Sequence, residues 1–340
     1  MAALSLAVRR RVAQGGKEGG ADIGLGAAGG RLLETVPWRP ALGGVDSIVE
    51  ARLGPPVPGG GGVFLDLPGG LQAMLKREAE APPLPSQGSR MLVQVRASAH
   101  GDKQCRVARS IIIRGRAATL SIAADGTATV DGPPAEADLL RRRWQAAEPG
   151  RAPVVLVHPA EQLIAAHAEE PLEVLVDDGP LATRLRTWAE AIGAAAEVRH
   201  LPTGDPLVEA GLAEPWAELA APLVALPGGG RLAIEPTAAL VAIDVDSAAD
   251  ARGPAAVNRA AAAEIPRQLR LRHLAGRVVI DFIGAGQGRA GGLGGALKTL
   301  EKGLADDPAR PHLAGRTRLG LVELTRPRRH PPLHPRGETP

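Results

Sequence analysis

The stretch Leu240-Val-Ala-Ile-Asp-Val-Asp-Ser247 indicates the fold of the C-terminal part of the chain. An apolar run precedes two acids, which is typical of a buried strand that ends at a polar edge. Further along, Val278-Val-Ile-Asp281 repeats this pattern, and the Ala-rich segment 254–274 between the two has helical spacing. A strand, a crossover helix and a second strand would place Asp244 and Asp281 at adjacent strand ends.

Two carboxylates at adjacent strand ends can hold Mg²⁺ together with several waters, because hard oxygen ligands suit that ion. Such a site would activate a water molecule and neutralise charge on a phosphodiester. The simpler interpretation is that each Asp only caps a turn or the next helix. For the matched pair, the residues alone leave both interpretations open.

Upstream of this region, strands and helices alternate. A helix is predicted from Glu136, and the apolar runs at 153–157 and 172–176 are typical of buried strands. Helices are expected at 160–167 and 181–192. This alternation indicates a small α/β unit.

The N-terminal third of the chain has a different character. Gly and Pro separate five short strand-like segments, at 48–53, 63–67, 71–75, 91–96 and 107–113. Their number and length favour a small barrel of the OB type, followed by a hairpin over 119–130. The first 40 or so residues are rich in Gly and Ala without a sustained period, which predicts a poorly ordered leader.

Composition limits the class of protein. The 340 residues include 43 Gly, 31 Pro, four Trp, two Phe and no Tyr, which favours two or three small domains with few aromatic side chains. The single Cys105 excludes an intramolecular disulfide and a zinc site of paired thiolates. No apolar run is long enough to cross a membrane and no signal peptide is evident, so a cytoplasmic protein is predicted.

Several motifs resemble the ribonuclease E/G family. The segments similar to that family's catalytic core are Ala239–Ser247, Asn258–Arg272, Val278–Ile283 and Leu319–Arg326. The segments Val63–Leu67 and Gln87–Val95, with Gly101-Asp-Lys103, resemble its embedded OB-fold RNA-binding domain. The resemblance covers roughly residues 45 to 335.

This resemblance implies a multidomain fold of mixed α+β and α/β class. It combines an OB-fold barrel, a ribonuclease H-like α/β unit and a deoxyribonuclease I-like catalytic domain. The expected divisions are a poorly ordered leader at 1–42, the OB fold at 43–118, a shortened connector at 119–135, the ribonuclease H-like unit at 136–220, the catalytic domain at 221–328 and a flexible tail at 329–340.

The resemblance also implies roles for particular acids. Asp244 and Asp281 fall on the family acids that bind catalytic Mg²⁺, and Asp246 stands where the family usually has Asn beside them in the catalytic site. The added charge would either tighten metal binding or raise a neighbour's pKa. Gly284 replaces a second family Asp and so removes another acid close by.

Four further residues correspond to family positions that contact RNA. Arg310 and Arg318 match arginines near the scissile phosphate, with a solvated surface charge as the simpler interpretation. Phe64 and Lys103 match barrel residues that stack a base and contact phosphate, although Phe64 would also suit the barrel core. Met74 replaces a second family aromatic, which predicts weaker stacking.

The end of the long predicted helix is rich in arginine. Arg267, Arg270, Arg272 and His273 either face phosphate or form a solvated helix face near the C-terminal dipole. Pro266 is expected to kink this helix or to mark a restart.

Two family features are not expected in this chain. The interval 127–136 is too short for the subdomain that senses the 5′ monophosphate of RNA. The Cys-Pro-x-Cys motif of the zinc link between protomers is absent, so no zinc-linked dimer is expected.

The function that the resemblance implies is a Mg²⁺-dependent endoribonuclease in RNA processing or decay. It would cleave single-stranded RNA by attack of metal-activated water, leaving 5′-phosphate and 3′-hydroxyl ends. The alternative is a catalytically weak paralogue that binds RNA without cutting it. Residues 286–291 also fit a dinucleotide fingerprint, but too few residues follow to complete that fold.

Overall fold

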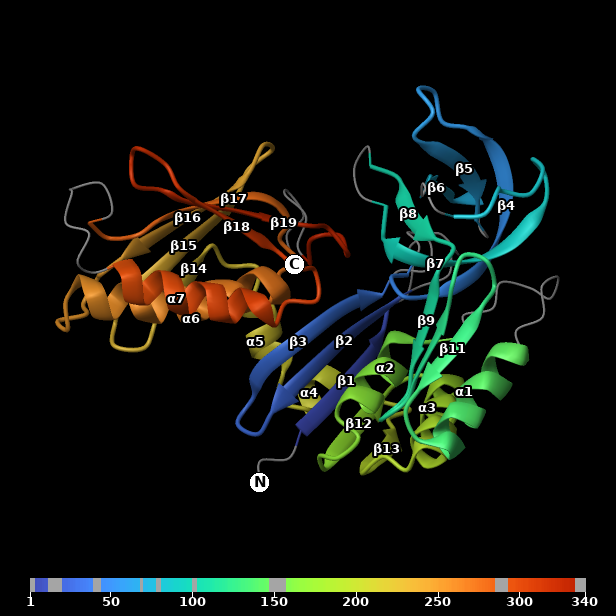
Figure 1. Ribbon diagram of the computed structural model, residues 1–340. Coiled ribbons are helices and arrows are strands. Elements are labelled where there is room, and N and C mark those ends of the chain that lie inside the picture. The colour runs from blue at the N-terminus through green and yellow to red at the C-terminus, as the bar shows by residue number, and fades with distance from the viewer. Residues whose placement is uncertain are drawn as a thin grey trace. The chain divides into compact units, whose positions relative to one another are not determined.

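The computed structural model describes residues 4–11, 20–38, 44–67, 70–77, 81–99, 103–146, 157–284 and 293–333. They form two compact units (Figure 1), one of residues 1–32 and 36–213 and one of residues 33–35 and 214–340. The strand expected at 153–157 falls outside the described residues except for its last position. The glycine motif at 286–291 lies wholly outside them.

A five-stranded sheet organises the first unit. Its order is β13-β12-β1-β2-β3, with β1 parallel to β12 and antiparallel to β2. The strands are β1 (Leu4–Arg10), β2 (Ala21–Ala27), β3 (Arg31–Trp38), β12 (Leu172–Val176) and β13 (Ala196–His200). β1 is the central strand, and its Leu6 and Ala7 are completely buried.

This sheet shows that the expectation of a poorly ordered leader at 1–42 is wrong. Three of the five strands come from that segment. The glycines that hide the apolar pattern have a packing role, since a Cβ on Gly26 would lie 2.3 Å from the Leu212 side chain. Glycine there reflects close packing and not disorder.

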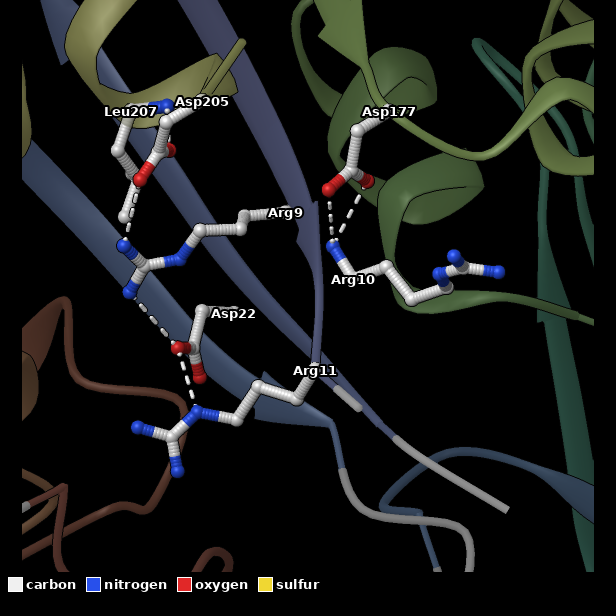
Figure 2. Close-up of polar contacts among 7 residues, drawn as sticks. All are labelled: Arg9, Arg10, Arg11, Asp22, Asp177, Asp205 and Leu207. Carbon is white, nitrogen blue, oxygen red and sulfur yellow. Dashed lines mark hydrogen bonds and ion pairs between the residues drawn. The ribbon is translucent and has the colours of Figure 1, made fainter. Parts of the chain in front are cut away.

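Ion pairs hold the end of β1 in place (Figure 2). Arg9 donates from Nη2 to Asp22 Oδ2 at 3.0 Å and from Nη1 to Asp205 Oδ2 at 2.9 Å. Arg11 Nε donates to the same Asp22 oxygen at 2.8 Å. Because Asp22 is completely buried, these guanidinium groups compensate a charge that would otherwise destabilise the fold.

A closed five-stranded barrel also belongs to the first unit. Its strands, in the order β4-β5-β6-β8-β7, are β4 (Ile48–Pro56), β5 (Gly62–Asp66), β6 (Gln72–Lys76), β7 (Arg90–Ala97) and β8 (Cys105–Ala108). Leu65, Val93 and Val95 lie fully buried in its core. The expected five-stranded barrel is confirmed and is consistent with an OB-like fold.

The segment expected as one strand at 107–113 is divided between two sheets. Its second half, β9 (Ile111–Arg114), pairs with the predicted hairpin of β10 (Thr119–Ile122) and β11 (Ala128–Asp131). The helices expected in the α/β unit are present as α1 (Pro134–Gln145), α2 (Pro159–Ala166) and α3 (Gly179–Ile192), and they are followed by two short helices, α4 (Pro206–Glu209) and α5 (Ala213–Glu218).

A six-stranded sheet forms the second unit, in the order β14-β15-β16-β17-β19-β18. Its elements are β14 (Leu223–Ala225), β15 (Arg231–Pro236), β16 (Val241–Asp246), α6 (Pro254–Leu271), β17 (Gly276–Asp281), α7 (Leu293–Ala305), β18 (His312–Arg316) and β19 (Val322–Arg326). Helices α6 and α7 lie side by side against the sheet (Figure 1), and they share one apolar core with it. None of the helices in the described part of the chain is long and apolar enough to cross a membrane.

The structure bears on two expectations for the second unit. Helix α6 continues through Pro266, so the expected restart is wrong, whereas a kink stays a prediction. Pro266 packs closely on α7, where a Cβ on Gly303 would lie 2.8 Å from the proline ring. The start of the expected flexible tail is also ordered, because the His330 ring lies 4.7 Å from the His273 ring. Residues 334–340 lie outside the described residues.

Candidate functional site

Asp244 and Asp281 are direct cross-strand partners. Strands β16 and β17 run parallel, and their register pairs Ile243 with Ile280 and then Asp244 with Asp281. Both isoleucines are buried in the core with α6 and α7. Because side chains alternate along a strand, the two aspartates face the opposite side of the sheet, where both are exposed. The expectation that the crossover would bring them together is confirmed.

The two carboxylates are available to a ligand. Neither forms a hydrogen bond or an ion pair with another described residue. Among the residues that the structure describes, no group of three or more His, Cys, Asp or Glu is placed to hold a metal ion. Mg²⁺ usually keeps several waters and binds through one or two carboxylates together with substrate phosphates. The donor pair therefore fits a hydrated magnesium ion better than a metal enclosed by protein ligands.

Asp246 points to the same face of the sheet but is engaged by an arginine. Arg231 pairs with it across β15 and β16, and its Nε and Nη2 donate to Asp246 Oδ2 at 3.0 and 2.6 Å. The Ala248 amide donates to Asp246 Oδ1 at 2.8 Å. This amide and the guanidinium hold the pKa of the Asp246 carboxyl below its ordinary value.

Sequence analysis did not find Arg231. The position of Arg231 beside Asp246 follows from the antiparallel pairing of β14 with β15 only when that register is continued from β15 to β16. The charge that Asp246 adds beside the aspartate pair is thus balanced by a neighbouring cation.

Asn258 on α6 holds the chain just beyond Asp281. Its Nδ2 donates to the Ile283 carbonyl and its Oδ1 accepts from the Ile283 amide, each at 3.0 Å. The Asn258 side chain is almost wholly buried, with the residue 1% exposed. Two hydrogen bonds from one buried amide fix the course of the backbone where β17 ends.

Arg310 and Arg318 lie at opposite ends of β18. Both β17 and β18 are antiparallel to β19, so β18 runs in the same direction as β17. The exposed Arg318 follows β18 and lies at the end of the sheet where Asp281 ends β17, whereas Arg310 precedes β18. A strand of this length measures about 16 Å. The structure therefore brings Arg318, and not Arg310, to the end of the sheet that carries the aspartates.

Phe64 lies on the outer surface of the barrel. Its neighbour Leu65 is buried in the barrel core, so Phe64 points outward and the core interpretation is wrong. The register places Phe64 beside Met74, and Met74 beside Arg106 on β8. Lys103 is exposed just before β8. The barrel thus presents an aromatic ring, a thioether and cationic side chains on its outside.

The arginines near the end of α6 have structural roles. Arg272 and His273 are buried, and Arg272 Nη1 donates to the Ala221 carbonyl at 2.6 Å. Burial lowers the pKa of Arg272 to about 10. Arg267 and Arg270 are half-buried and hydrogen bonded within the second unit. The expectation of a solvated or phosphate-facing helix end is therefore wrong for Arg272 and His273.

These features define a mixed α/β protein that carries a closed five-stranded barrel and, in its second unit, an exposed pair of aspartates on one sheet face. The model of the "Ribonuclease E/G family" matches residues 130–329. The chain belongs to the ribonuclease E/G family, as the motifs indicated.

Individual relatives match a shorter stretch. Ribonuclease E of Nostoc sp. is 48% identical over 116 residues, which cover 32% of this chain and 16% of that protein. Ribonuclease E of Escherichia coli is 40% identical over 116 residues, or 32% of this chain and 11% of that protein. The ribonuclease E/G-like protein of Porphyra purpurea is 38% identical over 117 residues, which cover 32% of this chain and 22% of that protein. The aligned stretch thus spans less than a quarter of each of these three relatives.

Proposed function

We propose that the protein is an endoribonuclease that cleaves single-stranded RNA with Mg²⁺ at Asp244 and Asp281. The observation that carries this proposal is the register of β16 and β17, which sets two carboxylates side by side on an exposed face, each without a side-chain partner among the described residues. Membership of the ribonuclease E/G family and relatives named ribonuclease E support it. We assign the second unit to a deoxyribonuclease I-like catalytic domain, the barrel to an OB fold and the five-stranded sheet to a ribonuclease H-like unit.

When bound, Mg²⁺ would supply activation of water and charge neutralisation at a phosphodiester. Asp244 and Asp281 offer the oxygen ligands, and Asn258 fixes the backbone that follows Asp281. Arg318 is available to pair with phosphate oxygens, because a planar guanidinium matches them in geometry. Water would attack phosphorus, the bond from phosphorus to the 3′ oxygen would break, and a proton released from the water would be replaced by one taken up on the 3′ oxygen, so that the products carry a 5′ phosphate and a 3′ hydroxyl.

The barrel would bind the RNA strand. An outward aromatic ring stacks on bases of any sequence, and nearby cations attract the backbone. Phe64 and Lys103 fill these roles in our proposal, with Met74 as a weaker stacking neighbour. A cytoplasmic location and the absence of a zinc-linked dimer stay predictions from the sequence.

A second candidate is an RNA-binding paralogue that does not cleave. The departures from the family pattern at Met74, Asp246 and Gly284, together with the short interval at 127–136, favour it. The two candidates differ in a single observable, which is strand cleavage that depends on Asp281.

The test is cleavage of internally labelled single-stranded RNA in Mg²⁺ and in EDTA. Asp281→Ala is compared with wild type and with Glu323→Gln, an exposed acid on the neighbouring strand β19. We expect the wild type and Glu323→Gln to cleave only in Mg²⁺ and Asp281→Ala to lose cleavage. Equal rates in Asp281→Ala and wild type would overturn the proposal. RNA binding without cleavage by any variant would support the paralogue.

A further inference from the structure

The open face of the second sheet carries two rows of polar side chains. Arg231 and Asp246 form one row across β15 and β16, and Asp244 and Asp281 form the other across β16 and β17. Asp246 follows Asp244 by two residues, so their Cα atoms lie about 6.6 Å apart and their side chains share one face. The three acids do not form a metal-binding group among the described residues as they stand. A turn of the Asp246 side chain toward Asp244 would bring it to a cation that binds between Asp244 and Asp281.

The hydrogen bonds of Asp246 oppose a turn of its side chain toward a cation at Asp244 and Asp281. Both of its carboxylate oxygens are engaged, Oδ2 by two nitrogens of Arg231 at 3.0 and 2.6 Å and Oδ1 by the Ala248 amide at 2.8 Å. Charge-assisted hydrogen bonds of this kind are stronger than neutral ones. The ion pair also cancels the charge of Asp246, which leaves the two charges of Asp244 and Asp281 to match a divalent cation.

We propose that Arg231 is a positioning residue that keeps Asp246 out of the metal coordination sphere. This inference rests on the proposed function. A Mg²⁺ ion held by two carboxylates keeps more coordination positions for water and substrate phosphate than one held by three. Releasing Asp246 would bind the ion more tightly and close one of those positions.

The alternative is that Arg231 itself contacts an RNA phosphate. It would then exchange its bonds with Asp246 for bonds to RNA, and its loss would weaken RNA binding without strengthening metal binding. A double-mutant cycle separates these two roles.

The test is a double-mutant cycle on the full chain, with Mn²⁺ as the paramagnetic probe and its affinity measured by electron spin resonance without RNA. The variants are Arg231→Gln, Asp246→Asn and the double variant. Arg277→Gln serves as the control for a general charge effect, because Arg277 is an exposed arginine at the other end of β17. RNA affinity in EDTA is measured for the same set.

We expect Arg231→Gln to raise Mn²⁺ affinity about tenfold, because it releases a third carboxylate and removes a cation. Asp246→Asn should change the affinity about threefold or less in wild type at physiological salt, where charges beyond the contact distance are screened. In the Arg231→Gln background, Asp246→Asn should lower the Mn²⁺ affinity about tenfold. Arg277→Gln should match wild type.

Equal effects of Asp246→Asn in both backgrounds would overturn the inference, as would loss of Mn²⁺ binding in Asp246→Asn alone. Unchanged Mn²⁺ affinity with weaker RNA binding in Arg231→Gln would assign the arginine to RNA instead. A wild type that neither binds Mn²⁺ nor cleaves RNA would remove the proposed function as well. If the wild type binds Mn²⁺ and cleaves RNA, but the effects of Arg231→Gln and Asp246→Asn on Mn²⁺ affinity are additive, only this inference would be overturned.

Discussion

Asp244 and Asp281 stand opposite each other in the parallel pair β16 and β17, each one residue beyond a buried isoleucine. The buried isoleucines fix the register, since a slip of one residue would turn every side chain to the other face. The apolar core therefore determines the juxtaposition of the two acids.

The first prediction is that the two aspartates act as one unit. Asp244→Asn and Asp281→Asn should each lower the rate of RNA cleavage on the order of a hundredfold, because either change leaves one charged ligand for Mg²⁺. The double variant should lose little more, as is usual for groups that serve a single step. Single-turnover rates with circular dichroism as the folding control provide the measurement. A double variant whose loss equals the product of the single losses would contradict this.

A second prediction separates the two arginines that flank β18. Arg318→Ala should lower the cleavage rate at saturating RNA, because Arg318 lies at the end of the sheet where β16 and β17 place their aspartates. Arg310→Ala should change this rate about twofold or less, since Arg310 lies about one strand length away. Paired measurements of rate and RNA affinity check this. A larger loss of rate in Arg310→Ala than in Arg318→Ala would reverse the assignment.

The barrel surface gives a third prediction. Phe64→Ala should weaken binding of single-stranded RNA by roughly 5- to 100-fold, the range for loss of one stacked base. Met74→Phe should strengthen it, because the second ring would lie directly beside Phe64. Leu65→Ala is the contrasting variant, since it should destabilise the barrel core. Binding titrations in EDTA, together with thermal unfolding, distinguish a lost contact from a lost fold.

Sequence reasoning reached the aspartate pair because the crossover unit is local. A strand, a helix and a second strand follow one another, and only one arrangement puts both apolar strands in the core. The first sheet could not be found in this way. Its central strand β1 has its parallel partner β12 far along the chain, and Gly24 and Gly26 interrupt the apolar pattern of β2.

Arg231 and the end of the chain were missed for different reasons. The partner of Asp246 depends on a hairpin register that motif spacing alone does not set. The tail is basic and Pro-rich, a composition that predicts flexibility, yet the His330 ring packs on the His273 ring. An imidazole loses its charge more readily than arginine or lysine and can then be buried.

A fourth prediction concerns acid stability. Burial and the nearby Arg326 guanidinium lower the pKa of His273 from 6.5 to about 3, and the pKa of His330 is also well below its ordinary value. The unfolded chain therefore binds more protons, so the free energy of unfolding of the second unit should fall as pH drops from about 6.5 toward 3.

His273→Asn should reduce the pH dependence of the free energy of unfolding of the second unit. The asparagine removes the titrating imidazole and tolerates the positive φ of 54° at this residue. His312→Asn is the control, because His312 is exposed in the same unit. Amide hydrogen exchange in β16 and β17, followed across this pH range, reports on the second unit specifically. Equal slopes in His273→Asn and wild type would show that His273 does not contribute.

The last prediction tests the ordered N-terminal segment. Asp22→Asn should lower the free energy of unfolding of the first unit by roughly 2–3 kcal/mol, because it removes the buried carboxylate shared by Arg9 and Arg11. This value is below that of a fully buried pair, since the two arginine side chains are 29% and 56% exposed and partly screened by water.

The matched control for Asp22→Asn is Asp138→Asn. Asp138 pairs with Arg141 on the surface of α1, where both side chains are more than half exposed, so its loss should cost less than about 0.5 kcal/mol. Urea unfolding followed by amide exchange in β1 and β12 provides the measurement. A leader without structure would leave both variants as stable as wild type, whereas a strand at the centre of the sheet makes only Asp22→Asn costly. Because β1 separates β12 from β2, loosening its end should raise exchange in both neighbours together.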